Sequence, residues 1–185
     1  MEKEMIGKAR VGVSPVAIVG AIVNGKANFA TLGGYGGMAQ NPPLVYITLA
    51  KPHYTNAGIR ETGYFSVNLP GPGLVKETDY VGLVSGRNVD KSRVFKTFYG
   101  SVDRAPMIEE CPINILCKVF KEIDLPNNDV FIGEIVEVYV DRACLTDGKP
   151  DITKINPLLL ATGAYWCLGK QAGTAYLDGK SLIKK

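Results

Sequence analysis

The chain has 185 residues, of which 46% are hydrophobic and 21% charged, and its formal net charge is +3. This length fits one domain covering residues 1–185, and the composition excludes a disordered chain. Lys and Arg are scattered rather than clustered, so we expect no nucleic-acid partner. The charged start MEKEMIGKAR, and an apolar run at residues 16–23 that is too short to cross a bilayer, predict a cytoplasmic protein with no membrane partner.

The first predicted elements form a β-hairpin. Residues 16–23 are apolar and β-branched, which is typical of a buried strand. The Asn24-Gly25 pair that follows is a strong hairpin signal, because a type I′ turn needs positive φ at both central residues. Residues 27–31 are the expected returning strand. Residues 32–43 contain several glycines and two prolines, and we expect them to form a loop.

Two more strands are predicted at residues 44–49 (LVYITL) and 64–69 (YFSVNL), with a short helix between them. The helix is expected from His53 to Glu61, with Thr55 as its N-cap and Gly63 closing it. Residues 70–72, Pro-Gly-Pro, end the second of these strands. Residues 74–98 have apolar residues near helical spacing and predict two short helices, with the SGRNVDK segment between them or opening the second.

The second half of the chain predicts a long hairpin. Residues 113–123 and 130–140 form its two strands, joined by a turn at residues 126–129. Asp147-Gly148 marks a further turn, and residues 158–160 and 165–168 are short final strands. The predicted fold class is therefore mainly β with inserted helices, in a single strand-rich barrel.

The titratable residues exclude several kinds of site. His53 is the only histidine, so any Ser-His-Asp or Cys-His arrangement would have to use that one imidazole. The four cysteines, at positions 111, 117, 144 and 167, lack CxxC spacing, so we expect small buried hydrophobic residues rather than a zinc site. The GxGxxG and P-loop patterns do not occur. We therefore expect no metal and name no catalytic side chain.

The segment at residues 85–91 contains the groups that a phosphate needs. Arg87 and Lys91 supply positive charge, Ser85 supplies a hydroxyl, and Gly86 allows close approach of the backbone. Elsewhere in the chain, Lys51 adds a cation, and Thr31 and Thr55 add hydroxyls. A phosphorylated ligand is thus one interpretation of this segment, and an ordinary polar turn is the other.

Eight stretches of the sequence together resemble the flavin reductase-like FMN-binding family and, within it, the flavoredoxin-like members. They occur in the family's order over roughly residues 10 to 170 and are SPVAIVGAI, ANFAT, NPPLVYITLAKPHYT, ETGYFSVNLP, GLVSGRNVDKS, APMIEECPINILCKV, VFIGEIVEVYVD and INPLLLATGAYWCLG. The resemblance implies an FMN-binding split β-barrel that forms a homodimer, with the flavin near the subunit interface.

The resemblance also implies roles for individual residues. The residues that would line the flavin ring are Asn28, Phe29, Ala30 and Thr31. Four more would stand near the ring or the phosphate: Lys51, His53, Tyr54 and Thr55. The residues that would hold the phosphate are Ser85, Gly86, Arg87 and Lys91. Two positions depart from the family pattern. Asn88 stands where the family often has an acidic residue. Asn128 stands where many nicotinamide-using relatives have histidine, which weakens the expectation that NAD(P)H is the donor and makes a redox protein the alternative.

The function expected from these observations is two-electron redox on bound FMN, as in flavin reductases or flavoredoxin-like electron transfer. In this reaction the flavin carries the chemistry and the protein binds and orients it. The alternative is a non-catalytic FMN carrier or electron-transfer module that docks a redox partner. A third interpretation is a dimeric ligand-binding barrel without redox activity.

Overall fold

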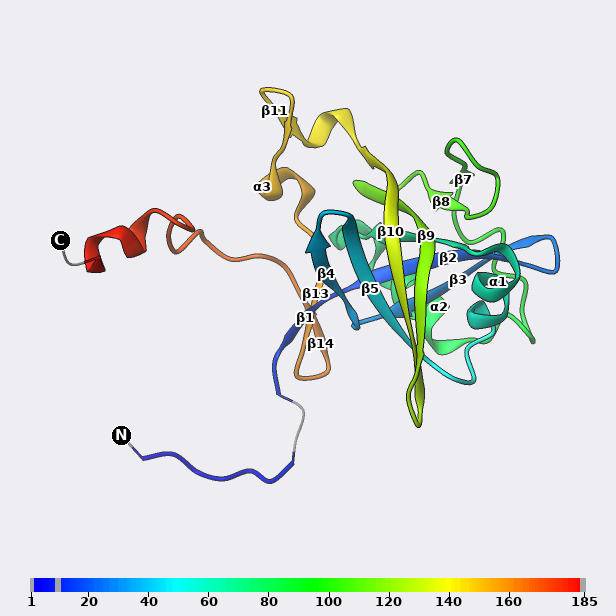
Figure 1. Cartoon of the computed structure of the whole chain (residues 1–185), viewed down its shortest axis with the longest axis horizontal. Helices are drawn as coiled ribbons and strands as arrows, with labels where there is room; N and C mark the ends of the chain where they lie inside the picture. The colour runs from blue at the N-terminus through cyan, green and yellow to red at the C-terminus, as the bar shows by residue number, and fades with distance from the viewer. Residues whose placement is uncertain (1, 9–10, 184–185) are drawn as a thin grey trace.

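A computed structural model of the chain describes residues 2–8 and 11–183. Its main feature is a seven-stranded antiparallel sheet with the order β3-β2-β6-β9-β10-β5-β4 (Figure 1). These strands are β2 (Ala17–Val23), β3 (Lys26–Leu32), β4 (Tyr35–Gln40), β5 (Pro43–Ala50), β6 (Tyr64–Leu69), β9 (Ile113–Asp124) and β10 (Asn128–Val140). The two end strands, β3 and β4, are not paired with each other, so the sheet forms a split barrel that is open at one seam.

Smaller elements surround this sheet. A three-stranded sheet contains β1 (Val13–Pro15), β13 (Leu159–Ala161) and β14 (Ala164–Trp166), and two short hairpins are formed by β7 (Thr97–Phe98) with β8 (Met107–Ile108) and by β11 (Leu145–Thr146) with β12 (Lys149–Pro150). The α-helices are α1 (Thr55–Thr62), α2 (Val75–Leu83) and α3 (Ile152–Ile155), and single 3₁₀ turns cover Pro72–Leu74, Arg142–Cys144 and Asp178–Leu182. None of the helices within the described ranges has the length and apolar composition needed to cross a membrane.

The core lies on both sides of β2, whose residues are almost all buried. One side packs into the barrel with Phe65, Val67 and Phe131. The other side packs under α2, where the rings of Phe29 and Phe95 meet edge to face with their centroids 5.3 Å apart. Apolar burial of this kind is the main favourable contribution to folding, and it places β3 and α2 side by side.

Helix α1 lies unusually close to the sheet. A Cβ atom added at Gly58 would come within 2.2 Å of the Ile22 carbonyl oxygen, so only glycine permits this approach. The helix ends as predicted, because Gly63 takes the left-handed conformation with φ 70°. Its start differs from the prediction, since Thr55 is the first helical residue rather than the N-cap. The cap residue is Tyr54, which makes no side-chain capping bond.

The predicted hairpin turns are confirmed. Asn24 and Gly25 have φ values of 50° and 73°, and Asp147 and Gly148 have 51° and 72°. Positive φ at two successive residues matches the right-handed twist of the strands that they join. The strands predicted at residues 44–49, 64–69, 113–123 and 130–140 all form, and residues 64–69 are matched residue for residue.

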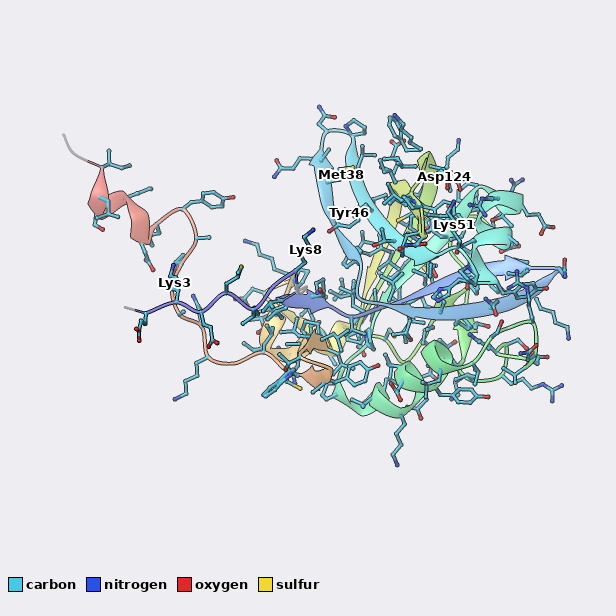
Figure 2. All side chains as sticks on the ribbon, turned by 90° about the horizontal axis from the view of Figure 1, so that it is seen from below. Lys3, Lys8, Met38, Tyr46, Lys51 and Asp124 are labelled. Carbon is cyan, nitrogen blue, oxygen red and sulfur yellow. The ribbon has the colours of Figure 1, made fainter. Side chains whose placement is uncertain are left out.

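The prediction of a loop at residues 32–43 is wrong, because residues 35–40 form the edge strand β4. This strand pairs with β5, and Gly36 lies opposite Tyr46. A Cβ at Gly36 would come within 2.7 Å of the Tyr46 ring, so the glycine provides space for an aromatic side chain. Figure 2 shows Met38 and Tyr46 on this pair of strands. Glycine-rich composition was therefore a misleading loop signal here.

The prediction of a second helix before Phe98 is also wrong. After α2 the chain makes turns over residues 85–96 and then the two-residue strand β7. The Asp90 carboxylate accepts hydrogen bonds from the Ser92 N–H and hydroxyl, at 2.9 and 2.6 Å. Such local side-chain bonds compete with helix formation. Among the cysteines, Cys111, Cys117 and Cys144 are buried as expected, whereas Cys167 is exposed.

Candidate functional site

A polar cavity opens at the free edge of β3. We call it the inner cavity; its volume is about 200 Å³, and it lies between β3, the turn before α1 and the segment after α2. The structure brings eight of the residues predicted from the sequence to this cavity: Asn28, Ala30, His53, Tyr54, Thr55, Ser85, Gly86 and Lys91. Residues more than fifty positions apart in the chain therefore share one small site.

The N-terminal end of α1 lies at the inner cavity, which the first residue of the helix, Thr55, lines. The first N–H groups of any helix have no partner within the helix, and the helix dipole favours negative charge there. The N–H groups of Asn56 and Ala57 make only long bonds of 3.3 Å, to the carbonyls of His53 and Tyr54. The Thr55 hydroxyl oxygen accepts from Asn28 Nδ2 at 2.8 Å, which leaves the hydroxyl proton available to a ligand. This end of the cavity suits an anionic oxygen.

Lys91 contributes a buried cation. Its ammonium group donates to the carbonyls of Phe29, at 2.9 Å, and Val81, at 2.8 Å, and so ties the free edge of β3 to the end of α2. Two of its three N–H donors are used in this way, and one remains. Burial lowers the pKa of Lys91 to about 8, so the group stays largely protonated at neutral pH. Lys91 therefore links the two elements that border the site and also supplies a positive charge to it.

Gly86 and Arg87 hold the 85–91 segment against the turn before α1. A Cβ at Gly86 would lie 2.0 Å from Asn28 Oδ1 and 2.9 Å from Tyr54 Cδ1. Arg87 Nη1 donates to the Pro52 carbonyl at 2.7 Å, and its guanidinium carbon lies 5.3 Å from the centroid of the Tyr54 ring. Arg87 lines an adjoining outer cavity of about 370 Å³, whose wall includes Asn28, Tyr54, Gly86 and Lys91 as well.

A larger cavity of about 530 Å³ lies on the other side of His53, and we call it the neutral cavity. Thr31, Thr48 and Asn128 line it, together with β1 and the hairpin of β13 and β14. Burial, and secondarily Lys91, lowers the pKa of His53, so its imidazole is uncharged at neutral pH. His53 lines both the polar inner cavity and this larger space, so the two cavities are neighbours.

Two predicted residues do not bring their side chains to these cavities. The Phe29 ring is fully buried against Phe95, so only its backbone reaches the site. Lys51 pairs with Asp124 at the end of the β9–β10 hairpin, as Figure 2 shows. Thr31 lines the neutral cavity, although its hydroxyl is already donated to the Thr78 carbonyl.

A buried network behind α1 was not predicted from the sequence. Asp129 Oδ2 accepts from Asn56 Nδ2 at 2.8 Å and pairs with Arg60 Nη2 at 2.6 Å, and the Asp129 side chain is only 4% exposed. Asn56 Nδ2 also donates to the Ala50 carbonyl at 3.1 Å. An acidic residue at the start of an otherwise apolar strand is the signal that could have revealed this network. No group of three metal-ligating side chains occurs within the described ranges.

Solved structures with this fold include flavoredoxins. The chain is 46% identical to flavoredoxin from Methanosarcina acetivorans, with a TM-score of 0.95 over 99% of this chain and 100% of that chain. It is 31% identical to flavoredoxin of Desulfovibrio vulgaris (Miyazaki F), with a TM-score of 0.90 over 96% of this chain and 100% of that one. The class defined by the fold is therefore the split-barrel proteins of the flavin reductase type.

The sequence comparison names the family. The model described as "Flavin reductase like domain" matches residues 11–168, and the chain therefore belongs to this family. An uncharacterised protein of Archaeoglobus fulgidus is 34% identical over 114 residues, which is 60% of this chain and 64% of that protein, so the match spans just under two thirds of its length. Family membership confirms the resemblance found in the sequence, and it supports a flavin-related redox function.

Proposed function

We propose that the chain is an FMN-binding flavoprotein that carries out two-electron redox, as a flavin reductase or as a flavoredoxin-like electron carrier. One observation supports this most directly. A polar cavity with a helix N-terminus, hydroxyl groups and a buried ammonium adjoins, at His53, a larger neutral cavity. A phosphate suits the first cavity and an aromatic ring system suits the second.

The residues present fit FMN. The phosphate would be held by Ser85 and Thr55, by the remaining N–H of Lys91, and by Arg87 from the adjoining outer cavity. Because the Phe29 carbonyl points away from β2 toward Lys91, the backbone groups of Thr31, two residues on, also face the free edge of β3. They would hold the polar edge of the ring. The flavin supplies the electron chemistry when it is bound, and these residues bind it, orient it and exclude water.

The first test is the choice of flavin. We expect tighter binding of FMN than of FAD, by at least about tenfold, because a terminal phosphate dianion matches the charge and hydroxyls of the inner cavity. In FAD this phosphate is joined to adenylate through a phosphoanhydride bond, so it carries one negative charge fewer and has a bulky group attached. Titration of the flavin-free protein with each flavin, followed by fluorescence, measures both affinities. Equal or tighter binding of FAD would contradict FMN as the cofactor.

Arg87→Ala should weaken FMN binding by about 1.5–3 kcal/mol, the usual contribution of a charge-assisted contact. Arg87 also holds the segment against Pro52, so its loss acts on the shape of the cavity as well as on its charge. Folding should change little, because this arginine lies on the surface. Calorimetry that finds unchanged FMN affinity in a folded variant would place the phosphate elsewhere.

The electron donor is either NAD(P)H or a redox protein. Asn128 lines the neutral cavity with an uncharged amide, which favours a protein donor, since an amide provides no positive charge for a dinucleotide phosphate. Steady-state oxidation of NADH and NADPH by the FMN-loaded protein distinguishes a flavin reductase from the alternative, an electron-transfer module or FMN carrier.

A location in the cytoplasm is part of the same proposal.

We also propose that the chain is a homodimer. Both terminal segments extend away from the sheet on the same side of the molecule (Figure 1). They expose large apolar side chains, including Met5 and Tyr176, and β10 exposes Val136 and Val138. Apolar surface of this kind is typical of an interface. Light scattering at micromolar concentration should give twice the monomer mass of 19.9 kDa, and a mass near 19.9 kDa would contradict the proposal.

A further inference from the structure

The small sheet of β1, β13 and β14 packs one of its two faces on the rest of the protein. The middle register row of this sheet joins Ser14, Leu160 and Tyr165. A Cβ at Gly33 would lie 3.4 Å from Leu160 Cδ2 and 3.7 Å from Ser14 Cβ, so this row faces β3 and β4. At the end of the row, the Tyr165 hydroxyl donates to Asp79 Oδ1 of α2 at 3.0 Å. Because successive side chains of a strand alternate between faces, the neighbouring rows point outward.

The outward face of this sheet is entirely apolar. Its two register rows are Val13, Ala161 and Ala164, and Pro15, Leu159 and Trp166. Val13 is 65% exposed and Trp166 is 55% exposed. The indole N–H of Trp166 already donates to the Ala161 carbonyl at 3.1 Å, so the rest of the ring offers apolar surface. A contiguous apolar face that remains exposed is typical of a protein interface.

Both ends of the chain leave from this sheet. We call residues 2–8 and 169–183 the terminal arms; the first leads toward β1 and the second follows β14, and both extend away from the main sheet (Figure 1). Every residue of the two arms is exposed. The C-terminal arm nevertheless has local structure, since the Thr174 N–H donates to Asp178 Oδ2 at 2.9 Å and a 3₁₀ turn covers Asp178–Leu182. Ordering such a segment costs conformational entropy, which contacts with a second molecule would offset.

The size of the outward face indicates what covers it. Three residues along each strand and three strands across give about 10 Å by 14 Å, or roughly 150 Å². A stable interface buries about 800 Å² on each partner, so this face needs the arms beside it. The C-terminal arm carries Tyr176, Leu182 and Ile183, which are 96%, 84% and 72% exposed. A second copy of the chain has the same apolar face and the same apolar arms, and a two-fold axis lets each copy cover the other.

We propose that a second copy of this chain docks on the outward face of the β1, β13 and β14 sheet, with the terminal arms of each copy lying along the other. The proposal rests on the homodimer in the proposed function, and it goes further by naming the surface that forms the dimer. Val13 and Ala161 line the neutral cavity as well. The second copy would therefore border the space that the proposed function gives to the flavin ring.

Three charged variants test this surface. Trp166→Asp should raise the dissociation constant of the dimer by at least about 30-fold, the effect of a central interface residue, because the two-fold axis places the charge in both copies. Val13→Asp is a second variant on the same face and should act in the same direction. Phe120→Asp is the matched control, because Phe120 is an aromatic residue of β9 that is 58% exposed, close to the 55% of Trp166, and it should dimerise as the parent does.

The measurement is sedimentation of each purified protein over a dilution series, with thermal unfolding as the check that the variants fold. Trp166 is the single tryptophan of the chain, so its fluorescence reports directly on the face. The emission of the parent should move to longer wavelength as dilution dissociates the dimer, because the indole passes from a buried contact into water. Parent-like dimerisation of both face variants, or equal weakening by Phe120→Asp, would overturn the proposal. Unchanged emission during dissociation would also overturn it.

Failure of the dimer itself would be visible separately. A parent mass near 19.9 kDa at micromolar concentration would contradict the homodimer and, with it, this docking surface. A dimeric parent whose dissociation constant is insensitive to Trp166→Asp and Val13→Asp would overturn the docking surface alone. FMN affinity is measured in its own titration, so neither result counts for or against flavin binding.

Discussion

Gly86→Ala should reduce FMN affinity by about 10- to 100-fold, the effect of overpacking a close contact by 1–3 kcal/mol. A Cβ at this position would lie 2.0 Å from Asn28 Oδ1. The Asn28 amide cannot turn away freely, because it is buried and its Nδ2 donates to the Thr55 hydroxyl. Either the 85–91 segment moves outward or Asn28 releases Thr55. Both changes distort the inner cavity.

The control for this variant is Gly73→Ala. Neither glycine has positive φ, so alanine fits both backbones, and nothing lies within 4 Å of a Cβ at Gly73. FMN affinity is measured by fluorescence quenching, and thermal unfolding checks that both variants fold. The control should bind FMN as the parent protein does. Parent-like affinity in Gly86→Ala would mean that the close approach of this segment does not form the phosphate site.

Asp129→Ala should lower the free energy of unfolding by about 2–3 kcal/mol, because it removes a buried carboxylate that pairs with a partly exposed arginine. Asp129 is almost fully buried and holds both Asn56 and Arg60 of α1. Arg60 is 45% exposed and can regain water, so the cost is smaller than for a fully buried pair. The melting temperature should fall by about 5–10 °C.

The same variant should also weaken FMN binding, because Asn56 directly follows Thr55, which lines the inner cavity. Asp124→Ala is the matched control. It removes the carboxylate of the exposed Lys51 pair and should change stability by less than about 0.5 kcal/mol. Chemical denaturation compares the two variants. An equal loss of stability in both would show that burial of Asp129 contributes nothing.

Much of the fold could be predicted from local signals. The turns at Asn24-Gly25 and Asp147-Gly148 need positive φ at two residues, and few residue types adopt this, so the sequence locates both hairpins. The strand at residues 64–69 lies between a glycine and a Pro-Gly-Pro turn, and its limits match the prediction. Local backbone preferences, together with apolar patterns, therefore determined most strands and the family resemblance.

The edge strand β4 shows where such signals fail. Its glycines favoured a loop because glycine is usually a turn residue. The structure uses Gly36 to make room for the Tyr46 ring on β5. Composition does not record which neighbour fills the space beside a glycine. Only the paired strand decides this.

The candidate site shows the same difference between what local sequence signals predict and what tertiary contacts decide. The sequence by itself determined which residue types could hold a phosphate, and eight of the predicted residues share the inner cavity. It did not determine where the lysines point. Lys91 turns inward because two carbonyls, from β3 and α2, satisfy its buried ammonium, whereas Lys51 turns outward to Asp124. These partners lie far apart in the chain, so only the tertiary structure decides which charge reaches the site.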